Sequence, residues 1–94
     1  MIPALARPRL ASKAKLRLDK KTGKQVLLYP EKGLLLNPTG AAILALCDGE
    51  RTLRQIVEGL QASYAQAPLE ALERDVQAFL SGLAERGLLE GLEP

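Results

Sequence analysis

Residues 34–52 read LLLNPTGAAILALCDGERT, and this stretch decides the fold. It predicts the end of a strand, a capped helix, a tight turn and the cap of a second helix. Asn37 is an N-cap residue followed by Pro38 at the first helical position, where the missing N–H costs nothing. The Asp-Gly pair at 48–49 ends this helix, and Thr52 can cap the next one.

Upstream of this stretch, three apolar segments separated by turns predict an antiparallel meander. Basic and apolar residues alternate over residues 13–18, which is the period of a half-buried strand. Residues 25–29 and 34–36 are the expected second and third strands, after turns at residues 19–23 and 30–33. We expect the third strand to lie at an edge of the sheet.

The downstream half is predicted to be helical. Apolar residues recur on one face after Thr52, to residue 64, and again from residue 68 to residue 86. Gly87 is a suitable C-cap, and Leu88 and Leu89 are expected to fold back on the core. The predicted fold class is therefore α+β, a three-stranded antiparallel β-sheet followed by three α-helices, winged helix-turn-helix-like.

The length of 94 residues predicts one domain. Pro3 and Pro8 oppose regular structure, so we expect residues 1–11 to be a flexible N-terminal arm ahead of a single folded domain at residues 12–90. No apolar run reaches the length of a bilayer span, and the charged residues and proline at 7–9 interrupt any signal-peptide core. These features predict a cytoplasmic protein.

The chain contains no histidine and a single cysteine, Cys47. Most metal sites and the usual nucleophile–base pairs need these residue types, so we expect no enzymatic activity, no metal and no cofactor. Cys47 follows an apolar helix and has no activating neighbour in the sequence, which indicates a buried structural thiol.

Charge is unevenly distributed along the chain. Residues 1–24 hold 8 basic and 1 acidic residue, a net charge of +7, whereas residues 25–94 hold 5 basic and 10 acidic residues, a net charge of −5. The basic hairpin can attract an acidic partner, with Lys20, Lys21 and Lys24 as the docking residues. It can equally be a solvated hairpin whose charges protect an exposed sheet edge.

Two kinds of ligand fit a winged-helix module. Duplex DNA needs basic side chains on the helix that enters the major groove, but the third predicted helix carries four acidic and two basic residues and would be repelled by phosphates. A winged-helix nucleic-acid-binding protein therefore stays as the alternative. An extended peptide needs only an open strand edge and an adjacent helix, and it is the function we expect.

The expected groove lies between the third strand and the third helix. A peptide would pair with the backbone of Leu34, Leu35 and Leu36. The opposite wall would come from helix positions beside the core stripe, of which two are small and leave room for a peptide side chain. These wall positions, which on helical geometry alone can equally face solvent, are Arg74, Asp75, Ala78 and Gly82.

Two long segments make the chain similar to a known family. Residues 7–90 resemble the pyrroloquinoline quinone biosynthesis protein D family. The resemblance rests on LLYPEKGLLLNPTGAAILALCDGERTLRQIVEGLQASY at residues 27–64 and DVQAFLSGLAERGLLE at residues 75–90, which keep the family's order and spacing.

This resemblance implies a peptide chaperone rather than an enzyme. The family is the stand-alone form of a recognition domain for ribosomally made, modified peptides. Its members bind the precursor peptide that supplies a Glu and a Tyr to the quinone. They present the peptide to a radical S-adenosylmethionine enzyme that joins those two side chains. In related domains the leader peptide adds to the third strand and rests against the third helix. An exposed edge also favours a homodimer or a monomer–dimer mixture.

Overall fold

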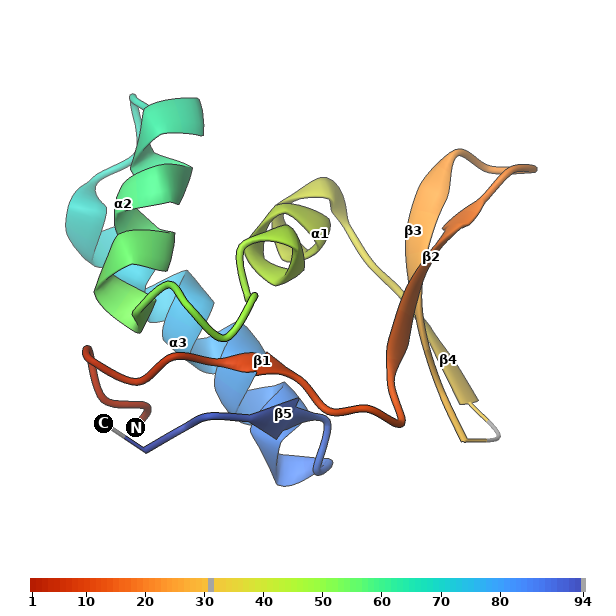
Figure 1. The fold of residues 1–94 in the computed structure, drawn as a ribbon. Helices are drawn as coiled ribbons and strands as arrows, with labels where there is room; N and C mark the ends of the chain where they lie inside the picture. The colour runs from red at the N-terminus through yellow and green to blue at the C-terminus, as the bar shows by residue number, and fades with distance from the viewer. Residues whose placement is uncertain (31, 94) are drawn as a thin grey trace.

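The computed structural model describes residues 1–30 and 32–93 and contains a sheet, three helices and a second, very short sheet (Figure 1). The predicted turn at residues 30–33 includes residue 31, which lies outside the described residues. The elements, in chain order, are β1 (Arg9–Leu10), β2 (Lys15–Asp19), β3 (Lys24–Tyr29), β4 (Lys32–Leu35), α1 (Pro38–Ala45), α2 (Leu53–Ser63), α3 (Leu69–Glu85) and β5 (Leu89–Glu90).

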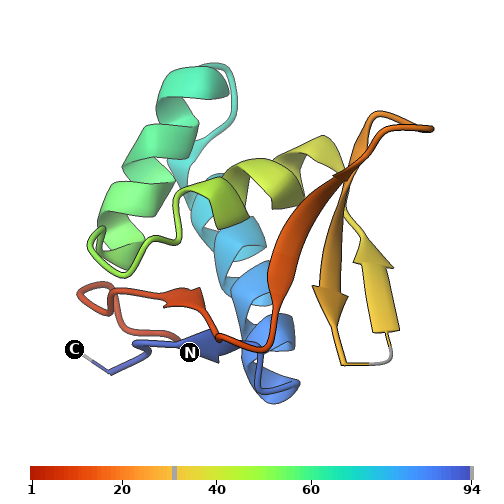
Figure 2. The same cartoon turned by 45° about the vertical axis from the view of Figure 1, so that its right-hand side comes forward.

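The larger sheet has the order β2-β3-β4, and all its pairs are antiparallel. Figure 2 shows β3 between the two edge strands, with α1 against one face of the sheet. Leu27 of β3 is the strand residue that is fully buried, with 0% of its surface exposed, because it faces the helices. The expected fold class and the edge position of the third strand of this sheet are confirmed.

Both predicted helix caps are present. Asn37 Oδ1 accepts a hydrogen bond from the Gly40 N–H at 2.7 Å. The Thr52 hydroxyl accepts from the Gln55 N–H at 3.2 Å, while the Gln55 side chain accepts from the Thr52 N–H at 2.9 Å, which is a complete capping box. These local interactions explain why the sequence predicted both helix starts, whereas the helix ends differ from the prediction by one or two residues.

The helices supply most of the core. The predicted stripe on α3 is buried at Leu72, Val76, Leu80 and Leu83, whereas Leu69 at the start of the helix is exposed. Leu88 and Leu89 fold back against the buried part of the stripe. β5 begins at Leu89 and packs beside α3 (Figure 1). Of the helices within residues 1–30 and 32–93, none is long and apolar enough to cross a membrane.

Residues 1–11 differ from the expected loose arm, because they pack against the helices and the C-terminal segment. β1 pairs with β5, and Ile2 and Ala6 are buried. The carbonyl groups of Ala6 and Ala4 accept from the first two backbone N–H groups of α2, at 2.8 and 3.1 Å. Helix N-termini leave such donors without partners, so this segment completes the cap of α2. The prolines in this segment predict that it forms no long helix or strand, but they do not predict whether it packs against the rest of the domain.

Gly91 allows the C-terminal segment to lie close to the backbone of residues 1–11. Its φ is +73°, and a Cβ at this position would collide with the carbonyl oxygen of Arg7. The Arg7 N–H donates to the Gly91 carbonyl at 3.0 Å. A side chain at position 91 would therefore oppose both the backbone conformation and the close pairing.

Candidate functional site

The free edge of β4 presents the backbone groups of alternate residues. The Leu36 N–H donates to the Gln25 carbonyl at 2.9 Å, so the backbone of Leu36 points towards β3. In an antiparallel ladder the next residue points its N–H and C=O the other way. With Leu34 opposite Leu27, the groups of Leu34 also point to β3, and those of Gly33 and Leu35 point to the open side.

This alternation refines the predicted site. Leu34, Leu35 and Leu36 do lie along the edge, but only Leu35 of the three directs its backbone outwards. Leu36 is buried, and Leu34 packs against the core. The residue that sequence reasoning missed is Gly33, because an apolar run gives no sign of which backbone groups a neighbouring strand uses.

Phe79 connects α3 to the end of β4. A Cβ placed on Gly40 would lie 3.1 Å from Phe79 Cε1, so the ring packs against the first turn of α1. That turn follows β4 after only two residues. The side of α3 that carries Phe79 therefore faces the end of β4. Phe79 is half-buried and lies at the edge of the buried stripe of α3.

Three of the four predicted wall residues lie on this side of α3. Asp75 and Gly82 are one helical turn from Phe79 in either direction, and Ala78 lies next to them. Asp75 and Ala78 are exposed. No neighbouring atom lies within 4 Å of a Cβ built on Gly82, so this part of the helix surface is open.

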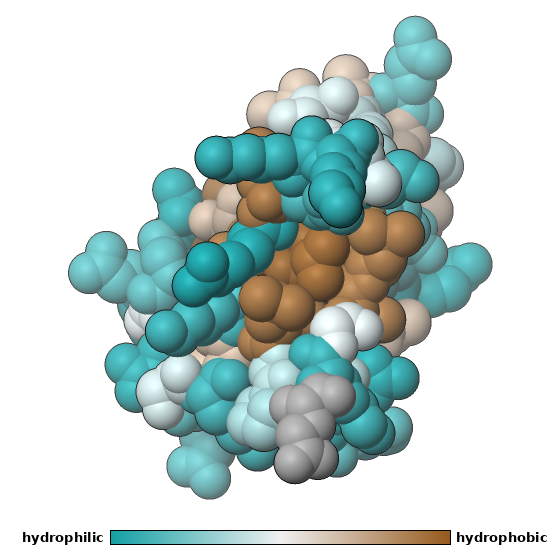
Figure 3. Space-filling view, turned by 90° about the vertical axis from the view of Figure 1, so that its right-hand side faces the viewer, coloured by the Kyte–Doolittle hydropathy of each residue, from teal (hydrophilic) through white to brown (hydrophobic). Residues whose placement is uncertain are grey.

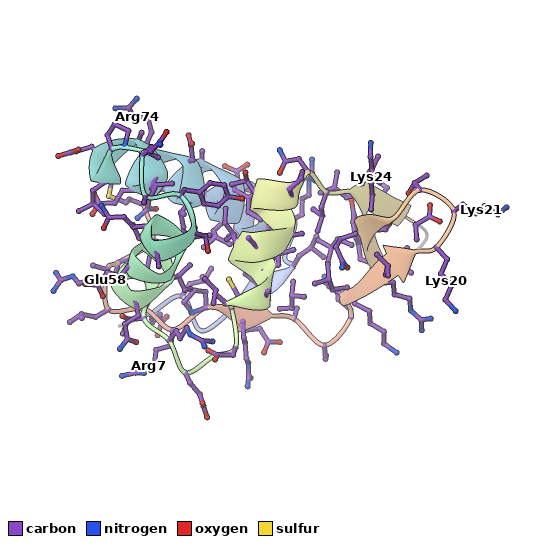
Figure 4. The ribbon with its side chains drawn as sticks, turned by 90° about the horizontal axis from the view of Figure 1, so that it is seen from above. Arg7, Lys20, Lys21, Lys24, Glu58 and Arg74 are labelled. Atoms are coloured by element: carbon purple, nitrogen blue, oxygen red, sulfur yellow. The ribbon has the colours of Figure 1, made fainter. Side chains whose placement is uncertain are left out.

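Arg74 differs from its predicted place. It lines a separate hollow of about 600 Å³ with the N-terminal segment and α2, beside Ile2, Leu53 and Gln77. Figure 4 shows Arg74 at the opposite end of the molecule from Lys20 and Lys21. The helical period predicts that Arg74 lies beside the buried stripe of α3. It does not predict which side of that stripe faces β4.

A second hollow lies where β4 meets α1. It has a volume of about 430 Å³ and is lined by Leu35, Leu36, Pro38, Ala41 and Lys24, among others. Lys24 thus brings a positive charge to one end of the β4 edge. Leu35, whose backbone faces outwards, is one of the lining residues, so the hollow lies beside the edge at which a strand would add.

The three lysines of the predicted docking patch do not form one cluster with this site. Lys20 and Lys21 are exposed at the β2–β3 turn, the far tip of the hairpin (Figure 4). Lys13, at the base of the same hairpin, reaches instead to Gly87 after α3, with its Nζ 3.2 Å from a Cβ built there.

The thiol of Cys47 is buried and has low nucleophilic reactivity. Its Sγ donates to the Ile43 carbonyl at 3.3 Å. Burial, with the nearby charge of Asp48 as the smaller cause, raises the pKa of the Cys47 thiol to about 12. Thiolate is the nucleophilic form, so the folded chain offers little of it at neutral pH.

The carboxylate beside this thiol has a structural role. The backbone N–H groups of Arg51 and Glu50, at 2.9 Å each, hold the pKa of Asp48 below its usual range. This Asp is part of the turn between α1 and α2. Across residues 1–30 and 32–93, no group of three or more His, Cys, Asp or Glu side chains is placed to hold a metal ion.

The edge, wall and hollow suit an extended peptide, and comparison with known proteins identifies the family. Residues 24–89 match the family described as coenzyme PQQ synthesis protein D (PqqD). The chain belongs to this family. The family predicted from the sequence is thus confirmed.

A relative from Bradyrhizobium diazoefficiens, named PqqA binding protein, is 40% identical over 84 residues, which cover 89% of this chain and 81% of that protein. The solution structure of the PqqD part of Methylobacterium extorquens PqqCD, described as a stand-alone recognition element for ribosomally synthesised, modified peptides, is 38% identical. It has a TM-score of 0.74, and the match covers 88% of this chain and 87% of that one.

A third similar protein is described with a bound peptide. TbiB1, in complex with the TbiA(β) leader peptide, is 25% identical and has a TM-score of 0.75. The match covers 92% of this chain and 99% of that chain. At least one protein with this fold therefore has a structure with a bound leader peptide.

Proposed function

We propose that this chain is a peptide chaperone of pyrroloquinoline quinone biosynthesis. It binds the ribosomal precursor peptide as an added strand on β4. The main observation behind this proposal is the outward-facing backbone of Gly33 and Leu35, next to an open wall on α3. Main-chain pairing supplies affinity, and pockets beside the strand supply specificity.

The wall on α3 completes the groove. Asp75, Ala78 and Gly82 form its outer part, and the Phe79 ring forms its apolar floor. The small side chain of Ala78 and the open surface at Gly82 leave room for a bulky peptide residue. Lys24, on β3 and beside the end of β4, would pair with a peptide carboxylate.

The bound peptide would then be presented to a second protein. In this proposal the partner is the radical S-adenosylmethionine enzyme that cross-links the Glu and Tyr of the precursor, and the chain itself does no chemistry. Both proteins would work in the cytoplasm. The relatives named PqqA binding protein support the choice of peptide, and the M. extorquens recognition element supports the role.

A homodimer would use the same edge. Pairing of β4 with β4 of a second copy would occupy the outward groups of Gly33 and Leu35. Peptide and second copy would then compete. Light scattering over a dilution series should show that added peptide shifts any dimer towards a peptide-bound monomer.

The test is an isotope-labelled titration with synthetic precursor peptide. The largest amide shifts are expected at Gly33, Leu35 and the α3 wall, with β2 little affected. Shifts confined to β2 or α2 would place the peptide elsewhere. A parallel titration with duplex DNA separates the alternative: sequence-dependent binding at physiological salt, which weakens steeply as salt rises, would contradict the peptide function.

A further inference from the structure

The face of the sheet that points away from the helices is apolar at its centre. Val26 and Leu28 of β3 point to this face, and Leu35 lies opposite Val26 on β4. Leu28 is 39% exposed and Leu35 is 56% exposed. We call these three residues the outer patch. Figure 3 shows a continuous hydrophobic surface on this side of the molecule.

Basic side chains border the outer patch. Lys15 lies opposite Leu28 and Arg17 lies opposite Val26 in the β2–β3 register, so both share the face with the patch. Lys24 occupies the same face at the other end of β3, where Asp19 lies opposite it as the one acidic residue that β2 brings to this face. Figure 3 shows hydrophilic side chains along the margin of the apolar surface. The two ion pairs among residues 1–30 and 32–93 both lie outside β2–β4.

We propose that the outer patch docks the peptide-modifying enzyme through a surface that is apolar at its centre and acidic at its margin. The inference rests on the proposed function and adds the surface that meets the partner. An apolar centre with complementary charges around it is the usual composition of a specific protein interface.

Continuity with the peptide site favours a protein that acts on the peptide. A strand added to β4 would turn alternate side chains to the outer face, beside Leu35. The peptide and the outer patch would then form one surface. An enzyme seated on this surface would contact the chaperone and its peptide together, and it would recognise the loaded chain over the empty one.

A second copy of the chain fits this face poorly. Lys15, Arg17 and Lys24 would meet the same cations on the other copy, and like charges across an interface cost free energy. The occupant of the outer patch is therefore an acidic protein surface. A second copy and an anionic membrane are the two occupants that the test must separate from it.

The experiment compares Leu28→Gln and Lys15→Glu with the control Leu18→Gln. Leu18 is 55% exposed and lies on β2, but its register partner Gln25 places it on the opposite face from Leu28. For each variant, calorimetry gives the affinity for the precursor peptide, and interferometry gives the affinity of the peptide-loaded chain for the purified radical enzyme. Sedimentation and binding to phosphatidylserine–phosphatidylcholine vesicles are measured on the same samples.

The expected result is a loss of about tenfold in enzyme affinity for Leu28→Gln and a smaller loss for Lys15→Glu, with peptide affinity unchanged. Leu18→Gln should bind both partners normally. Unchanged enzyme affinity in Leu28→Gln overturns the proposal, and accompanying loss of self-association or of vesicle binding then identifies the true occupant. Failure of the native chain to bind the peptide would instead contradict the proposed function, and calorimetry detects this separately.

Discussion

The two edges of the β2-β3-β4 sheet differ in how their strands are protected. β2 alternates its leucines with Lys15, Arg17 and Asp19, whereas β4 carries no charge after Lys32. Charged residues on an edge oppose the addition of another strand. β4 also has α1 and the Phe79 side of α3 beside it. An exposed edge thus becomes a candidate binding site when its strand lacks charged side chains and a second element lies beside it.

Leu27 lies on the central strand, between the two edge strands, and its truncation should have the largest effect on the stability of the fold. Leu27→Ala removes a fully buried side chain from the central strand and leaves a cavity, so we expect a loss of about 3 kcal/mol in the free energy of unfolding. Urea denaturation measures this change. The neighbouring variant Leu28→Ala, on the outer face, should cost less than about 1 kcal/mol. Equal losses for the two variants would contradict the assignment of the faces.

The second-largest effect is expected from a substitution in the α3 wall beside β4. Ala78→Trp places a large ring in the proposed groove without entering the core stripe, and peptide affinity should fall by about tenfold or more. Ala62→Trp, at an exposed position on α2, is the matched control and should bind normally. Full affinity in a folded Ala78→Trp variant would remove this wall from the site.

Local sequence signals predicted most of the fold. Asn37 and Thr52 fix helix starts through contacts within three residues, and the apolar periods of α3 and β3 fix which face is buried. The N-terminal segment was predicted less well, because its order comes from distant partners. Ala6 caps α2, and Gly91 accepts from Arg7, and neither contact has a pattern in the sequence.

The candidate site was predicted only in outline. The apolar strand and the third helix were identified, but the direction of each backbone group depends on the partner strand. Gly33 was therefore missed, and Leu34 and Leu36 were assigned an outward role that their ladder with β3 does not allow. The sequence predicted Arg74 in the wall because helical spacing shows which residues share a face of α3. It does not show which of these faces lies beside β4.

The charged tip of the hairpin should have the smallest effect. Reversing Lys20 and Lys21, the two lysines of this tip, to Glu should slow association with an acidic peptide or enzyme by roughly threefold at low salt, and the difference should shrink as salt rises. Stopped-flow fluorescence with each partner measures this. Unchanged rates with both partners would leave solubility as the role of these lysines.

The direct test of the β4 edge uses one proline on each edge strand. Proline removes a backbone N–H but is tolerated where that N–H points away from the sheet. Leu35 on β4 and Leu18 on β2 are equally exposed leucines, at 56% and 55%. The β3 groups not used by β4 pair with residues 15, 17 and 19, so Leu18 also points its backbone to the open side.

Calorimetry with the precursor peptide should therefore separate two variants that fold alike. Leu35→Pro should lose about tenfold or more in affinity, since a main-chain hydrogen bond is lost and the ring blocks the added strand. Leu18→Pro should bind as the native chain does, and Leu35→Ala, which keeps the N–H, should lose less affinity than Leu35→Pro. Native affinity in a folded Leu35→Pro variant, or an equal loss in Leu18→Pro, would contradict peptide binding at the β4 edge.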